Sequence, residues 1–308
     1  MARFIRKVVL YVLCIILLTV LIYVIMLSVS NKECWYSHEM NVVRSIEKLR
    51  VEQSPKIVFI GGSGLAFGLK SEKVQEFFGM PTYNTGTHGG LGLRLQVALF
   101  EEFINKGDIV VCVPEYQQFL GDFAYGNETA LRILSSTYPQ GYEHVTLKQH
   151  LYLLRYAPDV FRSALSSRNA EPYGGPYAVS ALNGYGDVEC YEFRGHVEGI
   201  PVGKLDGDLQ KQAFSILKDL DEYCSKCEAT FLVFPPAFRQ EAYEVNKSII
   251  NRIWTMLCDS GLPVVSCPQT YSFPDSLFYD TDYHLTKAGA DYRTNMIIMD
   301  INNALQFH

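Results

Sequence analysis

Residues 56–68 read KIVFIGGSGLAFG, and this stretch decides the fold of the chain. The apolar run at 57–60 is mostly β-branched and too short for a helix, which is typical of a strand buried on both faces. Glycines flank Ser63, so the backbone can turn sharply there and approach a ligand closely. We therefore expect the Ser63 hydroxyl to stand exposed at the carboxyl end of a strand, the edge at which open α/β sheets bind ligands.

Apolar runs and helical patterns alternate along the rest of the chain. Further strands are predicted at residues 82–84, 108–113, 230–234 and 263–266. Helical patterns begin at Ser71 and also cover residues 93–105, 208–227, 241–260 and 286–305. Such alternation indicates parallel strands joined by crossover helices. The sequence predicts an α/β domain around a five-stranded, mainly parallel sheet.

The amino-terminal segment has a different composition. Residues 8–29 are 22 uncharged and mostly apolar residues, long enough at about 1.5 Å per residue to cross about 30 Å of hydrocarbon. Three basic residues precede them, a pattern that keeps the amino terminus in the cytoplasm and the rest of the chain outside. A cleaved signal peptide is the alternative, but its apolar region would be shorter and residues 27–30 form a weak cleavage site. We predict a membrane anchor over residues 1–30.

The remaining chain divides into three parts. Residues 31–54 carry an amphipathic pattern and are interpreted as a helix or stalk. Residues 55–308 form the α/β domain, which is interrupted by an insertion at 119–206. The insertion holds two predicted helices and then a stretch at 171–203 rich in Gly, Pro and Tyr. Long irregular segments in compact domains are often lids or binding loops, so we expect the insertion to cover the active site.

Charge and cysteine spacing exclude some classes of function. The net charge is −6 without basic blocks, which argues against a nucleic-acid partner because phosphate binding needs clustered Lys and Arg. Residues 224–227 read CSKC but lack the second cysteine pair of a zinc site. We predict neither a metal nor another cofactor.

A serine nucleophile needs a base, usually His, that a carboxylate holds in place. Residues 279–286 read YDTDYHLT and supply His284, with Asp280 four residues before it and Asp282 two residues before it. Taken alone, Gly-Gly-Ser-Gly is an ordinary turn or a phosphate-binding nest, and an Asp-rich turn with one His is a solvated helix cap. Together, at opposite ends of the domain sequence, Ser63 and His284 favour catalysis.

Two further polar turns follow predicted strands. Residues 85–92 read TGTHGGLG, and residues 114–117 read PEYQ. His88 in the first turn either faces the same pocket as Ser63 or lies in solvent at a helix start.

These four blocks resemble the SGNH, or GDSL-like, hydrolase superfamily. The resemblance covers residues 55–118 and 228–305 and leaves the insertion outside it. The apolar anchor, the Pro-Glu-Tyr turn and the Tyr-His-Leu-Thr turn are similar to membrane-anchored members that work beside membrane-bound O-acyltransferases, such as the D-alanyl transfer protein of teichoic acid synthesis and the alginate acetylation proteins. The resemblance implies a flavodoxin-like α/β/α sandwich with a Ser, His, Asp triad.

Carried over residue by residue, the resemblance makes Ser63 the nucleophile and His284 the general base. The family's carboxylate stands three residues before His, where this chain has Thr281. Asp280 and Asp282 are therefore both candidates for the third member. We favour Asp280, because a looser turn lets its carboxylate reach back to Nδ1 of His284.

The resemblance also implies an oxyanion hole with three donors. The Ser63 N–H and the Gly86 N–H fit the first two positions, and Gly89 competes with Gly86. The family's third donor is an Asn side chain, which residues 114–117 lack, so Gln117 or Tyr116 would serve instead.

Glu115 cannot donate a hydrogen bond while it is ionised, and we assign it with His88 and Tyr116 to substrate binding. Loss of one oxyanion donor costs about 10² to 10³ in rate, so hydrolysis is expected to be weak. Such a site still suits acyl transfer from an activated carrier.

The sequence therefore predicts a membrane-tethered, extracytoplasmic serine O-acyltransferase or esterase. Its expected substrate is an acyl group, acetyl first of all, on a cell-surface polysaccharide or lipid-linked glycan, with a membrane-bound O-acyltransferase as partner. One alternative is a catalytically degenerate, glycan-binding or scaffolding subunit. Another is a flavin- or phosphate-binding site at residues 61–64, which would leave the Asp/His turn without a role.

Overall fold

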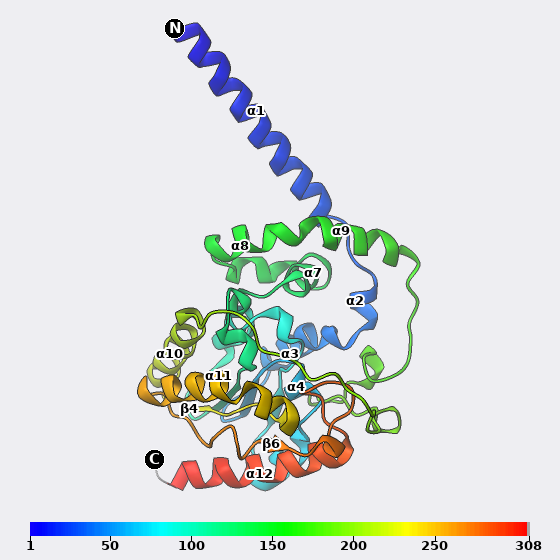
Figure 1. Cartoon of the computed structure of the whole chain (residues 1–308), viewed down its shortest axis with the longest axis vertical. Coiled ribbons are helices and arrows are strands. Elements are labelled where there is room, and N and C mark those ends of the chain that lie inside the picture. The colour runs from blue at the N-terminus through cyan, green and yellow to red at the C-terminus, as the bar shows by residue number, and fades with distance from the viewer. Residues whose placement is uncertain (307–308) are drawn as a thin grey trace.

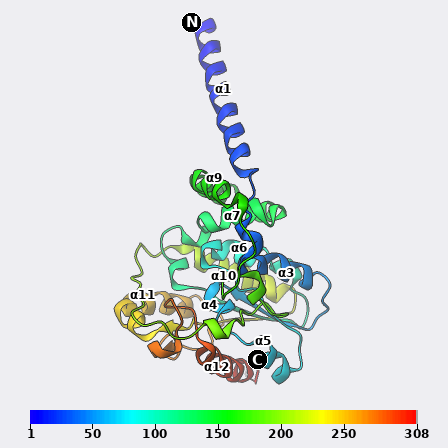
Figure 2. The ribbon, with the colours of Figure 1, turned by 90° about the vertical axis from the view of Figure 1, so that its right-hand side faces the viewer.

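A computed structural model describes residues 1–306 and contains one apolar helix followed by an α/β domain (Figure 1). Helix α1 (Ala2–Leu27) has no buried residue and is long and apolar enough to cross a membrane. It projects away from the domain in two perpendicular views (Figure 2). The predicted apolar segment is thus a single helix that packs only at its carboxyl end.

Four parallel strands form the central sheet. They are β1 (Ile57–Gly61), β2 (Thr82–Asn84), β3 (Ile109–Val113) and β4 (Thr230–Val233), in the order β2-β1-β3-β4. In the register, Ile57 lies opposite Thr82 on one side and Ile109 on the other. The parallel arrangement is confirmed, and β1 lies in the interior of the sheet, so the turn after it opens at the middle of the carboxyl edge.

The fifth strand predicted at residues 263–266 is present only as a parallel bridge between Val264 and Val233. Pro263 has no N–H to donate to a ladder, and Ser266 has φ of 124°, outside the β region. Within residues 1–306 the main sheet therefore has four strands. A second, two-stranded parallel sheet that the sequence did not predict pairs β5 (Phe238–Arg239) with β6 (Ser272–Phe273).

Helices cover both faces of the main sheet. They are α3 (Asn41–Leu49), α5 (Ser71–Phe78), α6 (Leu93–Ala98), α10 (Lys211–Lys226), α11 (Gln240–Asp259) and α12 (Lys287–Gln306). Val58 and Ile60 of β1 face the core shared with α3, α6, α10 and α11, whereas Ile57 and Phe59 face the core shared with α5 and α12. Alternate residues of one strand thus enter two cores, which is why the run at 57–60 is apolar throughout.

The insertion contributes three helices at the end of the domain nearest α1. They are α7 (Glu128–Ser136), α8 (Leu147–Leu153) and α9 (Ala157–Ser166), and they lie between α1 and the sheet (Figure 1). The chain leaving α1 is bonded to them: the Asn31 N–H donates to Ser136 Oγ at 2.9 Å, and its side-chain amide donates to Ser163 Oγ at 2.8 Å. These helices therefore position the domain relative to the apolar helix.

Candidate active site

Ser63 lies where the sequence predicts it, in the turn after β1. Strand β1 ends at Gly61, and the short helix α4 (Ser63–Ala66) starts two residues later. The carbonyl of Gly64 accepts a 2.7 Å hydrogen bond from Arg293 of α12, which holds this turn against the closing helix. Ser63 itself remains partly exposed, so its hydroxyl can be reached from solvent.

A chain of hydrogen bonds joins Ser63 to the turn before α12. His284 Nε2 lies 2.9 Å from Ser63 Oγ, and His284 Nδ1 lies 2.9 Å from an oxygen of Asp280. The turn is held by the backbone N–H of His284, which donates to Thr281 Oγ1 at 3.0 Å. Thr281 Oγ1 also accepts the Tyr283 N–H at 3.2 Å, and in the turn fixed by these two bonds Asp280 reaches the imidazole.

Two aromatic side chains hold the imidazole of His284 in place. The Phe67 ring stacks on it with 4.2 Å between centroids and 13° between planes. The Tyr177 hydroxyl donates to the second oxygen of Asp280 at 2.5 Å and lies 3.0 Å from His284 Nδ1. Tyr177 belongs to the insertion, which therefore contacts the site. Sequence reasoning did not single it out, and its only signal was the tyrosine-rich composition of residues 171–203.

The Asp280 carboxyl is suited to orient a base. Burial raises its pKa, but the hydrogen bonds from His284 and Tyr177 outweigh burial, so the pKa lies below its ordinary value. An ionised carboxylate at Nδ1 fixes the tautomer in which Nε2 accepts the hydroxyl proton of Ser63. Ser63, His284 and Asp280 thus have the contacts of a nucleophile, a base and an orienting carboxylate.

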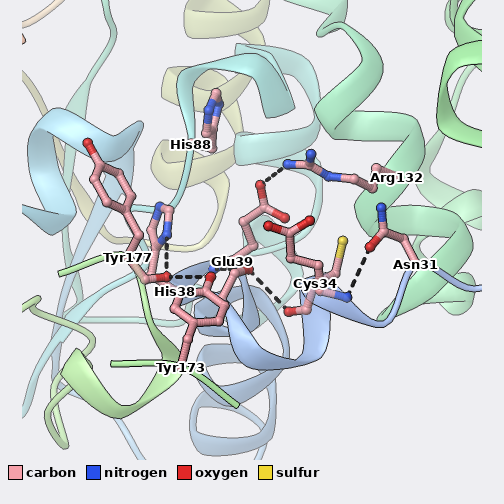
Figure 3. Close-up of a pocket in the computed structure, with 10 residues that line it drawn as sticks. Asn31, Cys34, His38, Glu39, His88, Arg132, Tyr173 and Tyr177 are labelled. Carbon is pink, nitrogen blue, oxygen red and sulfur yellow. Dashed lines mark hydrogen bonds and ion pairs between the residues drawn. The ribbon is translucent and has the colours of Figure 1, made fainter. Parts of the chain in front are cut away.

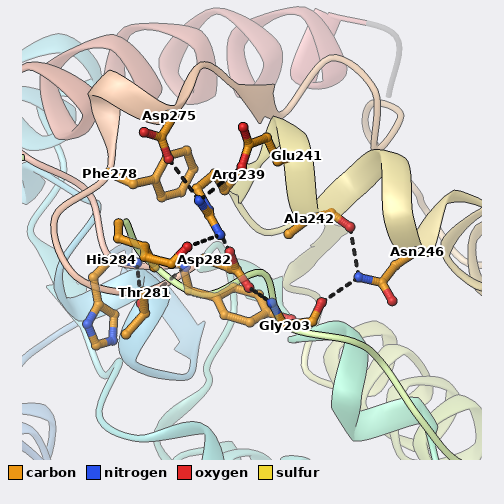
Figure 4. A network of polar contacts seen from close by, with 12 residues as sticks. Gly203, Arg239, Glu241, Ala242, Asn246, Asp275, Phe278, Thr281, Asp282 and His284 are labelled. Atoms are coloured by element: carbon orange, nitrogen blue, oxygen red, sulfur yellow. Dashed lines mark hydrogen bonds and ion pairs between the residues drawn. The ribbon is translucent and has the colours of Figure 1, made fainter. Parts of the chain in front are cut away.

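Asp282 is not part of this hydrogen-bond chain, so its assignment as a triad candidate is wrong. Its carboxylate accepts a 2.7 Å bond from Arg239 Nε and a 2.8 Å bond from the Gly203 N–H. Arg239 is 2% exposed and also pairs with Asp275. The His284 side chain points away from this cluster (Figure 4). The two carboxylates of this turn thus have different partners: Asp280 binds the imidazole, and Asp282 binds the buried guanidinium of Arg239.

The Gly86 N–H is not free to stabilise an oxyanion, contrary to the prediction. It donates to Asn84 Oδ1 at 2.9 Å in a local turn of the kind that Asn side chains favour. Gly89, the competing candidate, lies against Glu115: a Cβ atom at this position would collide with the Glu115 carboxyl. Gly89 has no side chain, and this allows the turn to approach Glu115 so closely.

Tyr116 and Gln117 do not meet Ser63 either. Tyr116 is fully buried in the core and packs edge-to-face against Phe238, so its assignment to substrate binding is wrong. Gln117 lines a separate cavity with Asp282 and Tyr283, and its assignment as the third oxyanion donor finds no support there. Both residues belong to the 3-10 turn Tyr116–Phe119, in which Tyr116 enters the core and Gln117 faces the separate cavity.

Glu115 is the residue of this third turn that reaches the serine. Its carboxyl accepts a long 3.4 Å bond from the Gly64 N–H and a further bond from the Ser63 N–H. It is 5% exposed, so it is a buried neighbour of Ser63 rather than a surface contact for substrate. Burial raises the pKa of Glu115 to about 7 despite these two bonds.

A polar cavity of about 220 Å³ adjoins the site and contains His88 (Figure 3). Tyr177 connects the cavity to the site: its carbonyl oxygen lies 3.3 Å from His38 Nδ1, and its hydroxyl contacts the Asp280 carboxylate. Arg132 of α7 forms an ion pair with Glu39 in its wall. His88 therefore faces a cavity, but Ser63 and His284 do not line it, so the prediction that His88 shares the Ser63 pocket is not supported. The other lining residues are Asn31, Glu33, Cys34, Ser37 and Tyr173.

The two cavity histidines are held neutral. Burial lowers the pKa of His38 to about 4 and also lowers the pKa of His88. Within the described chain, His38 Nε2 is buried and has no hydrogen-bond partner. Because Nδ1 of the neutral His38 ring donates to the Tyr177 carbonyl, Nε2 carries a lone pair and can accept a hydrogen bond from a hydroxyl group.

In comparison with known proteins, no protein-family model and no curated protein matches this chain. Its function is therefore inferred from the geometry of the site.

Proposed function

We propose that this protein is a serine O-acyltransferase or esterase of the SGNH-like type, with Ser63 as nucleophile, His284 as general base and Asp280 as the orienting carboxylate. The observation that carries the proposal is the pair of 2.9 Å contacts from Ser63 Oγ through the imidazole to Asp280. Ser63 and His284 are 221 residues apart in sequence, and a chance contact would not require a carboxylate on the second ring nitrogen.

The proposed reaction has two steps. In the first, Ser63 Oγ attacks the acyl carbonyl while His284 Nε2 takes the hydroxyl proton, and the leaving alcohol or thiol departs with that proton. In the second, an acceptor hydroxyl or water attacks the acyl-serine ester, and its proton passes through His284 back to Ser63 Oγ. Atoms balance without a redox partner or metal.

The arrangement of helices around the four-stranded sheet also supports this proposal. Helices cover both faces of a parallel sheet, and the site lies at the carboxyl edge, which suits the flavodoxin-like α/β/α sandwich of the SGNH superfamily. The bridge at Val264 takes the place of the fifth strand.

The acceptor in this proposal is a hydroxyl-bearing glycan. The cavity beside Tyr177 combines the unused His38 nitrogen, a second neutral imidazole and an internally paired Arg132. The lining has two carboxylates, Glu33 and Glu39, against one cation, Arg132, so it disfavours an anionic ligand, and its neutral polar groups suit the hydroxyls of a glycan. A cell-surface polysaccharide or lipid-linked glycan fits this description, with a free hydroxyl as acceptor in transfer or with an acetyl ester as substrate in hydrolysis.

Helix α1 supports a membrane location for the reaction. With three basic residues before it, the helix would keep its amino terminus in the cytoplasm and hold the domain outside. Tethering raises the effective concentration of the domain toward a membrane-bound acyl donor, such as the product of a membrane-bound O-acyltransferase.

A non-catalytic, glycan-binding subunit is the second candidate. The occupied Gly86 N–H and the carboxyl of Glu115 beside Ser63 favour it, because both reduce the ordinary means of oxyanion stabilisation. Labelling with a serine-directed reagent separates the two candidates, because only an enzyme should carry an activated Ser63.

The test uses the full chain in detergent with a fluorescent fluorophosphonate, which labels activated serines. The wild type is expected to be labelled at Ser63, as located by mass spectrometry of the labelled peptide. The variant Ser63→Ala should lose the label, and Ser166→Ala, at an exposed serine of α9, should keep it. An unlabelled wild type, or equal labelling of Ser63→Ala, would reject the enzyme proposal.

A further inference from the structure

The carboxyl of Glu115 occupies the place where an oxyanion hole would form. It accepts bonds from the N–H groups of Ser63 and Gly64, the first two residues after the strand turn. Cβ atoms on Gly62 or Gly89 would collide with its oxygens, so the carboxyl fills the gap between these two glycine turns. An acyl group bound to Ser63 Oγ would place its developing charge beside the same N–H groups.

Within the described chain, no cation pairs with this buried carboxyl. Glu115 forms no ion pair, although it is 5% exposed. The titratable groups around it are the phenols of Tyr283, from the turn before α12, and Tyr116, from its own turn, and burial raises the pKa of both well above the ordinary value. His88, on the turn that carries Gly89, accepts the Gly90 N–H through Nδ1.

Two charge states of Glu115 have opposite effects on the proposed reaction. An ionised carboxylate beside Ser63 would compete for the N–H donors and repel a developing oxyanion. A protonated carboxyl has one O–H donor and can give a hydrogen bond to that oxygen. In some enzymes an apolar environment keeps a catalytic carboxylic acid protonated at neutral pH, so that it can donate a hydrogen bond to an oxyanion. Protonated Glu115 would thus supply, from the same turn, the donor that the resemblance assigns to an Asn side chain.

We propose that Glu115 is a catalytic residue that acts in its protonated form as the side-chain donor of the oxyanion hole, and that its ionisation switches the site off. This inference rests on the proposed function, because it needs an acyl group on Ser63. It reverses the expectation that Glu115 only contacts substrate.

The pH dependence follows from burial. Burial raises the pKa of Glu115 from its ordinary 4.5 to about 7, so the active, protonated form is present below that pH. Above it, the protonated fraction falls about tenfold per pH unit, and the acylation rate should fall with it.

The experiment measures kcat/KM for hydrolysis of p-nitrophenyl acetate between pH 5.5 and 9 with the full chain in detergent, and subtracts the rate of Ser63→Ala. The wild-type rate should fall about tenfold per unit above neutral pH. Glu115→Gln carries an amide donor of similar shape that does not ionise, and should lose this fall. Glu115→Met has no donor and should be about 10²- to 10³-fold slower than Glu115→Gln across the range.

Two results would overturn the inference while leaving the proposed function standing. One is a Ser63-dependent rate whose descending limb is the same in wild type and Glu115→Gln, or absent in both. The other is a Glu115→Met variant as fast as Glu115→Gln. A rate that does not depend on Ser63 at any pH would instead reject the proposed function and remove this inference with it.

A stability measurement tests the protonation state without relying on activity. A carboxyl whose pKa is raised on folding binds its proton more tightly in the folded state, so wild type should lose stability between pH 4.5 and about 7 and then level off. The urea midpoint of Glu115→Gln should not show this loss. Parallel curves for the two proteins would contradict a neutral Glu115.

Discussion

Asp280 and Asp282 share one turn but have different partners. Asp280 accepts from His284 and from the Tyr177 hydroxyl, whereas Asp282 is held by Arg239 and the Gly203 N–H. The two side chains are alike in chemistry, so only their surroundings distinguish an orienting carboxylate from a structural one.

This difference predicts opposite effects of the same substitution. Asp280→Asn should lower Ser63-dependent turnover by about 10³- to 10⁴-fold with little loss of stability, because the amide favours the wrong imidazole tautomer. Asp282→Asn should leave turnover of the folded protein within about tenfold but lower the free energy of unfolding by about 3 kcal/mol, because the buried Arg239 loses a charged partner. Measurements of activity and of urea unfolding on both variants test these two predictions. Full activity in Asp280→Asn would exclude Asp280 from the proposed triad.

At the scale of elements, the insertion supplies part of the site rather than only covering it. Tyr177 lies just before the 3-10 turn Val179–Ala181, and its hydroxyl bonds the Asp280 carboxylate. The same residue forms part of the wall of the polar cavity. The insertion therefore couples the proposed base to the proposed acceptor site.

Removal of this hydroxyl should weaken catalysis without unfolding the domain. Tyr177→Phe keeps the ring beside Phe67 but removes a donor to Asp280, and turnover should fall about tenfold, as expected for one hydrogen bond to a charged group. Because that bond helps to lower the Asp280 pKa, the acid limb of the pH profile should move to higher pH. Tyr152→Phe, which loses only a 3.5 Å contact with the Tyr156 hydroxyl in the same insertion and lies outside the cavity, is the matched control. Equal effects of the two variants would contradict this role of Tyr177.

The sheet depends on a buried ion pair at its amino end. Lys56 Nζ lies 2.6 Å from Asp108, and both side chains are fully buried. Asp108 also accepts the backbone N–H groups of Lys56 and Asn105, so it connects the starts of β1 and β3. The lysine that opens the fold-determining stretch thus has a structural function.

Loss of one member of this pair should be costly. Lys56→Met leaves a buried carboxylate without its cation and should lower the free energy of unfolding by about 3 to 5 kcal/mol. Lys106→Met removes a cation from an exposed pair with Glu228 and should cost less than about 1 kcal/mol. Urea unfolding of both variants tests the contrast, which equal losses would refute.

At the scale of the whole molecule, α1 and the domain meet through the insertion. The link at Asn31 is bonded to Ser136 of α7 and Ser163 of α9, and α1 itself extends beyond the domain (Figure 1). The α7–α9 layer therefore lies at the end of the domain that α1 leaves. The polar cavity contacts this layer through Arg132 of α7.

The apolar helix should by itself account for membrane binding. Full-length protein reconstituted with neutral phosphatidylcholine vesicles should float with them on a density gradient, and a chain that begins at Ser28 should stay at the bottom because it lacks the span. A truncated chain that floats equally well would assign membrane binding to the domain surface instead.

The sequence alone determined those features that depend on local pattern. The apolar run at 57–60 predicted a strand buried on both faces, the alternating patterns predicted parallel strands and helices, and residues 8–29 predicted the apolar helix. Ser63 and His284 could be selected as a pair because each lies in a turn with a recognisable composition. Hydrophobic periodicity and turn composition depend only on residues that are close in sequence, so they can be recognised without knowledge of the tertiary structure.

Only the tertiary structure decided which groups meet. It brought Asp280 rather than Asp282 to the imidazole, used the Gly86 N–H within its own turn, buried Tyr116 and placed Glu115 beside Ser63. These outcomes depend on side-chain direction and on competing partners such as Arg239, which is distant in sequence from the turn that it binds. Hydrogen bonds and burial are set by neighbours in space, and a linear pattern does not specify them.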